Sequence, residues 1–227
     1  MQKQYRVSRI YPWPAQPVST SRADTVIAMP SKKPGRPRAT DITDAIKKTA
    51  ARTMATDGYS KLSVDGLATE VGTTRPTFYR RYPSIAHLVL EILDENFGAG
   101  PEANTGSLRG DLLAMQVDHV KMMASPLVSK TLAGLFEEIA NDPSVHDIYR
   151  DQFVLPRRAH VRRVITAAVE RGEISPATDL QLEAVCDMLN GPVISRVLLP
   201  IDAPLNDGFA RSIVDAVCAF LGAPPAK

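Results

Sequence analysis

The sequence predicts an all-α protein. From Thr40 onward, apolar residues recur at spacings of three and four, which is the pattern of helices that bury one face. Glycine, proline and short polar residues interrupt this pattern at the places where helices begin and end. We find no segment in which apolar and polar residues alternate as in a half-buried strand, and no internal repeat.

Length and composition are those of a globular protein. The chain has 227 residues, of which 44% are hydrophobic and 23% charged, enough for two modest domains. No apolar run approaches the roughly 20 residues of a membrane-spanning helix, and no apolar stretch follows the basic residues Lys3, Arg6 and Arg9 as in a secretory signal. We therefore expect a cytoplasmic protein without a membrane partner. We interpret Cys186 and Cys218 as small buried residues in a reducing compartment.

Charge is distributed unevenly along the chain. Residues 1–97 contain 15 Lys and Arg against 9 Asp and Glu, whereas residues 98–227 contain 12 against 16. This asymmetry indicates that only the first part meets a polyanion. Residues 1–39 are expected to be a disordered basic arm, because six prolines interrupt it and no apolar periodicity survives. Met29 is an alternative start of the chain.

Four helices are expected in a domain over residues 40–97. The first follows an N-cap at Thr40 or Asp41 and ends at Gly58. The second runs from Ser63 to Gly72, the third opens at 73–74, and the fourth starts at 83–84. The loop 98–106 is predicted to be a domain boundary. The apolar residues that define these helices are Ile42, Ile46, Ala50 and Met54, then Val64, Leu67, Ala68 and Val71, then Phe78 and Tyr82, then Leu88, Val89, Ile92 and Leu93.

A second domain over residues 106–222 is expected to be helical throughout. Pro126, Asn141–Pro143 and Gly172 are the predicted ends of its first three helices. The stripes lie within 108–122, 132–139, 153–171, 182–197 and 209–221.

The segment Ser63–Tyr82, SVDGLATEVGTTRPTFYRRY, fits the plan of a helix-turn-helix. Gly72 suits the turn, Ala68 is small enough for the helices to cross closely, and Phe78 can lock them together. The outward face of the second helix then offers hydroxyls, arginines and a tyrosine, which are partners for phosphates and base edges. A helical hairpin with a solvated basic face is the alternative. The predicted DNA contacts on this face are Thr73, Thr74, Arg75, Thr77, Tyr79, and Arg80 or Arg81.

Residues 40–97 closely resemble the DNA-binding domain of the TetR/AcrR family of transcriptional regulators. The family pattern "IA..AGVS.GTLYRHF" appears here as LATEVGTTRPTFYRRY. The resemblance implies an N-terminal three-helix helix-turn-helix domain followed by a helical ligand-binding and dimerisation domain. It also implies that Thr73–Tyr82 enters the major groove and that Ser63, Thr74 and Tyr79 contact phosphates. The matching positions are Leu67, Ala68, Gly72, Thr77, Tyr79 and Tyr82.

Two positions depart from the family pattern. Pro76 replaces a glycine, which the first turn of a helix tolerates. Ile85 replaces a lysine that commonly holds a phosphate, so more of the DNA contact is expected from Arg75, Arg80 and Arg81.

A basic segment, KKPGRPR over residues 32–38, precedes the first helix. Its Gly-Arg-Pro core resembles the AT-hook, which predicts that Arg36 and Arg38 enter a narrow minor groove. The alternative is a flexible leader that adds nonspecific attraction. Both predict salt-sensitive DNA binding.

The second domain is expected to form a homodimer, because one helix-turn-helix is too small to bind DNA specifically. The family resemblance implies that Leu180–Leu199 and Phe209–Leu221 pair with the same helices of a second copy. A pocket for a small apolar or amphipathic effector is expected between these helices and the DNA-binding domain, with ordinary core packing as the alternative for each lining residue. The candidates are Met115, His119, Met122, Met123, Phe136, Phe153 and Met188. The arginines at 157, 158, 162 and 163 are interpreted as a solvated face balanced by nearby acids.

No catalytic or metal-binding pattern is present: we find no P-loop, no dinucleotide-binding glycines, no G-x-S-x-G and no paired histidine spacing. We therefore expect no enzymatic activity and no cofactor. The predicted function is a TetR-type repressor that binds a palindromic DNA operator as a dimer and is released by a small ligand. The alternatives are a ligand-independent activator or global regulator, and a helical adaptor that lacks DNA binding.

Overall fold

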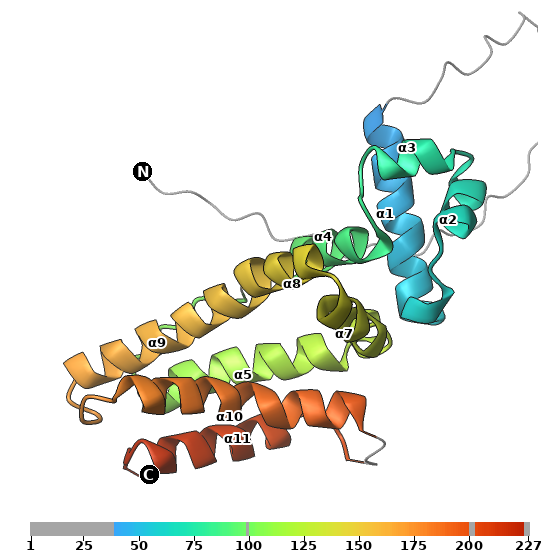
Figure 1. The fold of residues 1–227 in the computed structure, drawn as a ribbon. Coiled ribbons are helices and arrows are strands. Elements are labelled where there is room, and N and C mark those ends of the chain that lie inside the picture. The colour runs from blue at the N-terminus through green and yellow to red at the C-terminus, as the bar shows by residue number, and fades with distance from the viewer. Residues whose placement is uncertain (1–38, 99, 200–202, 225–227) are drawn as a thin grey trace, which may run out of the picture. The chain divides into compact units, whose positions relative to one another are not determined.

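The computed structural model describes residues 39–98, 100–199 and 203–224, and all regular structure in these ranges is helical, as predicted (Figure 1). The described residues belong to one compact unit. The elements are α1 (Ala39–Thr56), the short 3-10 helix η1 (Tyr59–Lys61), α2 (Val64–Val71), α3 (Arg75–Tyr79), α4 (Ile85–Phe97), α5 (Leu108–Ala124), α6 (Pro126–Ser129), α7 (Leu132–Asn141), α8 (Pro143–Tyr149), the π-helical turn η2 (Arg150–Val154), α9 (Leu155–Glu170), α10 (Asp179–Leu198) and α11 (Asp207–Phe220).

Capping residues fix the short helices α2 to α4 at the predicted places. The hydroxyl of Ser63 accepts a hydrogen bond from Gly66 N at 3.0 Å, and that of Thr74 accepts one from Thr77 N at 3.4 Å. Gly72 ends α2 in the left-handed conformation, with φ at 71°, which a glycine adopts without strain. Local side-chain chemistry therefore sets the boundaries of the helix-turn-helix.

Four details differ from the sequence-based expectation. Helix α1 begins at Ala39, so Thr40 and Asp41 lie inside it and neither is its N-cap. Helix α3 spans only Arg75–Tyr79 instead of the ten residues expected from Thr73 to Tyr82. The short helices α6 and α8 were not predicted, because four and seven residues are too few to show a readable periodicity. The long helix expected around 153–171 starts as the π-helical turn η2 before it continues as α9.

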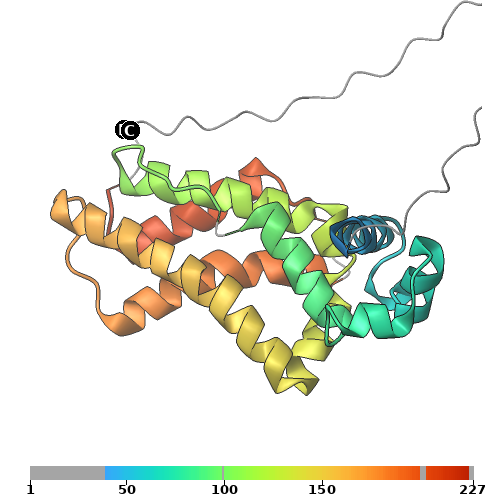
Figure 2. The same cartoon turned by 90° about the horizontal axis from the view of Figure 1, so that it is seen from above.

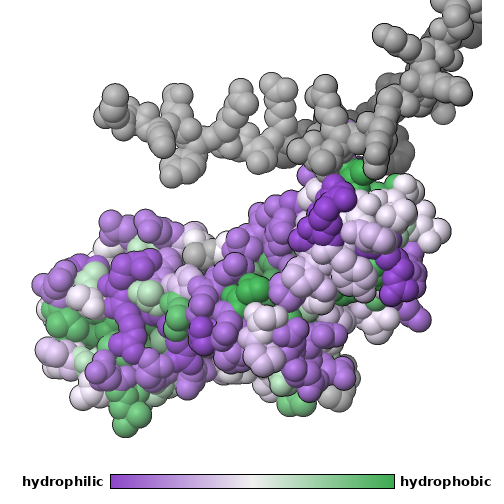
Figure 3. Space-filling view, turned by 45° about the horizontal axis from the view of Figure 1, so that its top comes forward, coloured by the Kyte–Doolittle hydropathy of each residue, from purple (hydrophilic) through white to green (hydrophobic). Residues whose placement is uncertain are grey.

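Helix α5 packs against α9, α10 and α11 in the larger bundle, which consists of α5 to α11 (Figures 1 and 2). Its buried residues include Leu112 and Val120, which are at most 1% exposed. Cys186 and Cys218 are buried free thiols, as expected, and burial raises the pKa of both. In the view of Figure 3, hydrophilic residues cover most of the visible surface and hydrophobic ones form small separate patches.

Two junctions join α1–α3 to the larger bundle. Helix α4 carries Leu88 and Val89 in the core and continues toward α7 and α8. Helix α1 packs on α6, where Lys130 Nζ donates to Thr56 O at 2.8 Å and Lys130 O accepts from Tyr59 N at 3.2 Å. The position of α1 is therefore tied to the start of the α6–α7 segment.

Candidate DNA-binding face and ligand cavity

The core of the helix-turn-helix is built around Phe78, which is fully buried. Its ring lies 5.6 Å from that of Tyr82, and the buried Leu67 and Ala68 of α2 belong to the same small core. This core holds α3 against α2 by one side and leaves its other side at the surface.

The exposed side of α3 carries polar and basic groups. Thr74, Arg75, Tyr79 and Arg80 are exposed, and Tyr79 is 47% exposed although its ring contacts Phe78 edge-on at 5.6 Å. Thr73 and Thr77 are half-buried at its margin. Six of the predicted DNA contacts thus lie together on and beside α3.

Arg75 is held in place by neighbours on both helices. Its Nη1 donates to Asp65 Oδ2 of α2 at 3.1 Å, and the Tyr79 hydroxyl and Asp65 together raise the pKa of Arg75. An exposed ion pair of this kind contributes little to stability. The guanidinium can therefore exchange Asp65 for an external anion at small cost.

Arg81 lies away from this face. Its Nε donates to Thr43 Oγ1 of α1 at 2.7 Å and its Nη1 donates to Thr77 O at 2.9 Å, so the side chain fastens α3 to α1. Ser63 serves as the N-cap of α2, at the end of that helix opposite the turn at Gly72. Arg36 and Arg38 lie outside the described residues.

A cavity of about 180 Å³ lies in the larger bundle, between α5, α7, η2, α9 and α10 and below the end of α4. Six of the seven predicted ligand contacts line it, and Met188 does not. Three aromatic rings form one wall: Tyr149 lies 5.9 Å from Phe136 edge-on and stacks on Phe153 at 5.7 Å. The six are Met115, His119, Met122, Met123, Phe136 and Phe153.

The polar groups of this cavity come mostly from α5 and α9, with Asn190 added from α10. Gln116 is buried and donates from Nε2 to Leu189 O at 2.8 Å. His119 Nε2 is buried and forms no hydrogen bond within the described part of the chain. Burial, together with the charge of Arg157, lowers the pKa of His119 to about 4, while the amide of Asn190 acts weakly in the opposite direction. The imidazole is therefore neutral at pH 7.

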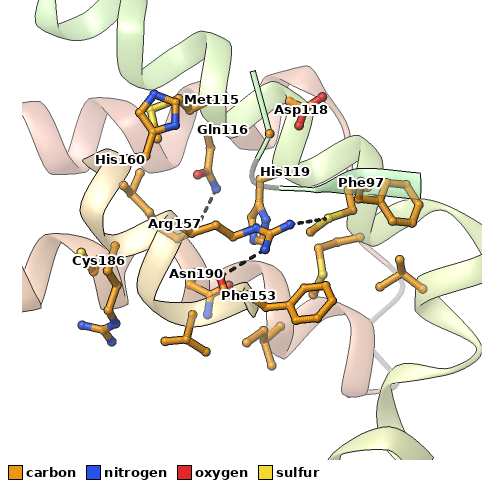
Figure 4. Close-up of a pocket in the computed structure, with 18 of the residues that line it drawn as sticks. Phe97, Met115, Gln116, Asp118, His119, Phe153, Arg157, His160, Cys186 and Asn190 are labelled. Carbon is orange, nitrogen blue, oxygen red and sulfur yellow. Dashed lines mark hydrogen bonds between the residues drawn. The ribbon is translucent and has the colours of Figure 1, made fainter. Parts of the chain in front are cut away.

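Arg157 of α9 is one of several polar cavity residues that the sequence did not reveal, together with Gln116, Asp118, His160 and Asn190. The expectation of a solvated arginine face holds for Arg158, which pairs with Glu183 and Asp187 of α10, and for Arg162, which pairs with Glu183. Arg157 instead turns inward and lines the cavity beside His119 (Figure 4). It follows Phe153 by four residues, a spacing that favours the same side of a regular helix, but the π-helical turn that contains Phe153 makes this signal ambiguous.

No group of three or more His, Cys, Asp or Glu side chains in the described ranges is arranged to hold a metal ion. Among the same residues, no helix has both the length and the apolar character needed to cross a membrane.

Comparison with known proteins agrees with this architecture. Residues 46–92 match the family model described as bacterial regulatory proteins of the tetR family, and residues 102–217 match the tetracyclin repressor-like C-terminal domain. An uncharacterised helix-turn-helix (HTH-type) transcriptional regulator of Mycobacterium tuberculosis is 31% identical over 171 residues, which are 75% of this chain and 83% of that protein. The DNA-binding transcriptional repressor TetR of Mycobacteroides abscessus is 28% identical over 81% of this chain and 95% of its own length.

Solved structures give the same result. The crystal structure of a TetR-family transcription regulator aligns with a TM-score of 0.58 at 25% identity, over 81% of this chain and 99% of that one. The two family models together cover both the helix-turn-helix and the larger helical domain. This chain therefore belongs to the TetR family of DNA-binding transcriptional regulators and not to a family of enzymes.

Proposed function

We propose that this protein is a dimeric repressor, which binds a palindromic operator in the cytoplasm and is released from it by a small apolar or amphipathic effector. The observation that carries the proposal is the exposed face of α3. Thr74, Arg75, Tyr79 and Arg80 project from one short helix whose orientation is fixed by the buried Phe78. Such a face fits the major groove, where arginines and hydroxyls contact base edges and phosphates.

Dimerisation is assigned to α10 and α11. Large apolar side chains on or beside these helices are exposed in the single chain, and a second copy would cover them: Leu180 is 81% exposed, Leu199 53% and Phe220 44%. Two copies joined there present two α3 helices, as a palindrome requires. Replacing Leu199 and Phe220 by Glu is expected to give a monomer in sedimentation analysis. Replacing the equally exposed Leu155 of α9 by Glu is the control, and it is expected to leave the dimer intact.

The effector is assigned to the cavity because α4 connects the cavity to the DNA-binding domain. Leu93 and Phe97 at the end of α4 line the cavity, while Ala86 and Leu88 near its start belong to the buried core. A ligand that displaces the end of α4 therefore acts on the element that follows α3. Such a displacement would alter the spacing of the two α3 helices, which must match successive major grooves about 34–36 Å apart.

Binding of the full chain to the DNA that flanks its own gene tests the proposal. Fluorescence anisotropy is expected to show salt-sensitive binding, because arginine–phosphate contacts release counterions. The double substitution Arg75→Ala with Tyr79→Phe is expected to weaken binding about tenfold or more while helicity stays unchanged. The matched control is Arg163→Ala, which removes an exposed arginine of α9.

Three results would contradict the proposal. One is an intact dimer that binds none of this DNA at low salt, which would favour the adaptor. Another is a double variant that loses helicity, which would make Arg75 and Tyr79 structural. The third is increased transcription from the neighbouring promoter when the protein is present, which would identify an activator.

A further inference from the structure

Arg157 occupies an unusual position for a charged side chain. Its guanidinium carbon lies 5.5 Å from the centre of the Phe153 ring, and Nη1 donates to Phe153 O at 3.1 Å. Nη2 donates to Gly98 O and to Met122 Sδ, the latter at 3.6 Å. All these acceptors are neutral. The guanidinium therefore lies in an apolar wall and is held by carbonyl, sulfur and ring contacts.

No carboxylate in the described ranges lies within 4.0 Å of Arg157, in contrast to Arg158 one residue further along, which has two acidic partners on α10. Asp94 and Asp118 act on Arg157 only through longer-range electrostatics, and both are exposed. A cation that is largely removed from water is costly unless an anion compensates it. The guanidinium of Arg157 thus has no carboxylate in direct contact, although Asp118 also lines the cavity.

A second donor lies beside the guanidinium. His119 has a buried Nε2 without a hydrogen-bond partner among the described residues, and its neutral ring carries one N–H. Figure 4 shows its ring next to the Arg157 side chain. In the tautomer that carries this proton on Nε2, the imidazole N–H and the fork of guanidinium N–H groups together suit a carboxylate, which accepts several hydrogen bonds.

We propose that the cavity binds a small amphipathic monoanion whose carboxylate pairs with Arg157 and His119. Its apolar part lies against Met122, Phe136 and Phe153. The size of the cavity supports a body of about one ring, because a cavity of roughly 150 Å³ is enough for benzene and this one measures about 180 Å³. The inference rests on the proposed function, since it names the chemical class of the effector.

Arg157 also links the ligand to the DNA-binding domain. Gly98, whose carbonyl Arg157 holds, is the residue directly after α4. Nη2 already donates to Gly98 O and Met122 Sδ, so a carboxylate bound in bidentate fashion through Nη2 must displace one of these contacts. Binding of a negatively charged ligand therefore changes the contacts at Gly98, directly after α4, the helix that follows α3.

Calorimetric titration of the full chain tests the ligand class. Phenylacetate, phenylacetamide and phenethylamine are probes of nearly equal size with negative, neutral and positive end groups, and hexanoate is an anion without a ring. Phenylacetate is expected to bind at least about tenfold more tightly than phenylacetamide, because hydrogen bonds between two charged groups are the stronger ones. Phenethylamine is expected not to bind.

Arg157→Gln is expected to abolish the preference for phenylacetate, while Arg163→Gln, on the same helix and exposed, keeps it. Equal binding of phenylacetate and phenylacetamide by the unaltered protein would overturn the proposal without any variant. Tighter binding of phenethylamine, or no binding of either anion at millimolar concentration, would do the same.

A DNA-binding measurement on the same preparation separates the two proposals. Protein that binds its flanking DNA without preferring anions contradicts only the ligand class. Protein that prefers phenylacetate but never binds the DNA contradicts the repressor and leaves the ligand class standing.

Discussion

Phe78 and Tyr79 are neighbours in α3, but we predict opposite consequences when each is truncated to alanine. Phe78 is 0% exposed, so Phe78→Ala removes a ring that is surrounded on all sides and leaves a cavity in the buried core of the helix-turn-helix. Such truncations cost about 3–5 kcal/mol. Tyr79 is 47% exposed and loses mainly one edge contact with Phe78, which is worth about 0.5–1.5 kcal/mol.

Thermal denaturation followed by circular dichroism measures the difference. A protein of this size loses about 2–4 °C of Tm for each kcal/mol, so Phe78→Ala is expected to lower Tm by roughly 6–20 °C. Tyr79→Ala is expected to lower Tm by no more than about 6 °C, yet to weaken DNA binding at a temperature where both variants are folded. A small decrease in Tm for Phe78→Ala, or unaltered DNA binding for Tyr79→Ala, would refute the assignment of a buried side and a DNA-contacting side to α3.

Three further predictions concern other parts of the molecule. Arg81→Leu is expected to lower the free energy of unfolding by about 1–3 kcal/mol because it breaks the hydrogen bonds to Thr43 and Thr77 O. Arg80→Leu should lower only the affinity for DNA, so equal stabilities of the two variants in a denaturant titration would contradict this difference. Thr178→Ala removes the capping box at the start of α10 and should cost about 1 kcal/mol in the same assay. The pKa of His119 is about 4 in the folded protein and about 6.5 when unfolded. The contribution of His119 to the free energy of unfolding is therefore fully present above pH 6.5 and falls by roughly 3 kcal/mol toward pH 4. His119→Gln should flatten that part of the stability–pH curve, and an unchanged slope would show that His119 is not buried as described.

The helix-turn-helix could be predicted closely from the sequence because its boundaries depend on single residues. Ser63 and Thr74 cap α2 and α3, and Gly72 adopts a positive φ between them. These are local effects, so they are visible in sequence. The length of α3 was overestimated, because Tyr82 follows the apolar Phe78 at a helical spacing of four although the helix ends at Tyr79.

The cavity was predicted in part because its lining depends on packing. Met115 and Met122 lie on one regular helix, α5, where spacing identifies the inner face. Met188 lies on α10 within a continuous apolar stripe, and spacing alone could not show that it misses the cavity. Arg157 follows the π-helical turn η2, which changes the helical register by about one residue. Its inward direction could not be separated from the solvated direction of Arg158 until the turn itself was known.

The bonds that Arg81 makes to Thr43 and Thr77 O have a consequence for how such a protein can change over time. They join α3 to α1 within a single block, and α1 in turn is anchored through Thr56 O to Lys130. When α1 and α3 move together as one rigid unit, the exposed face of α3 keeps its structure. Under the proposed function, substitutions at Arg75, Tyr79 or Arg80 are therefore expected to change the DNA sequence that is bound while the response to the proposed effector is preserved. Substitutions around Arg157 are expected to change the preferred effector while the DNA sequence is kept.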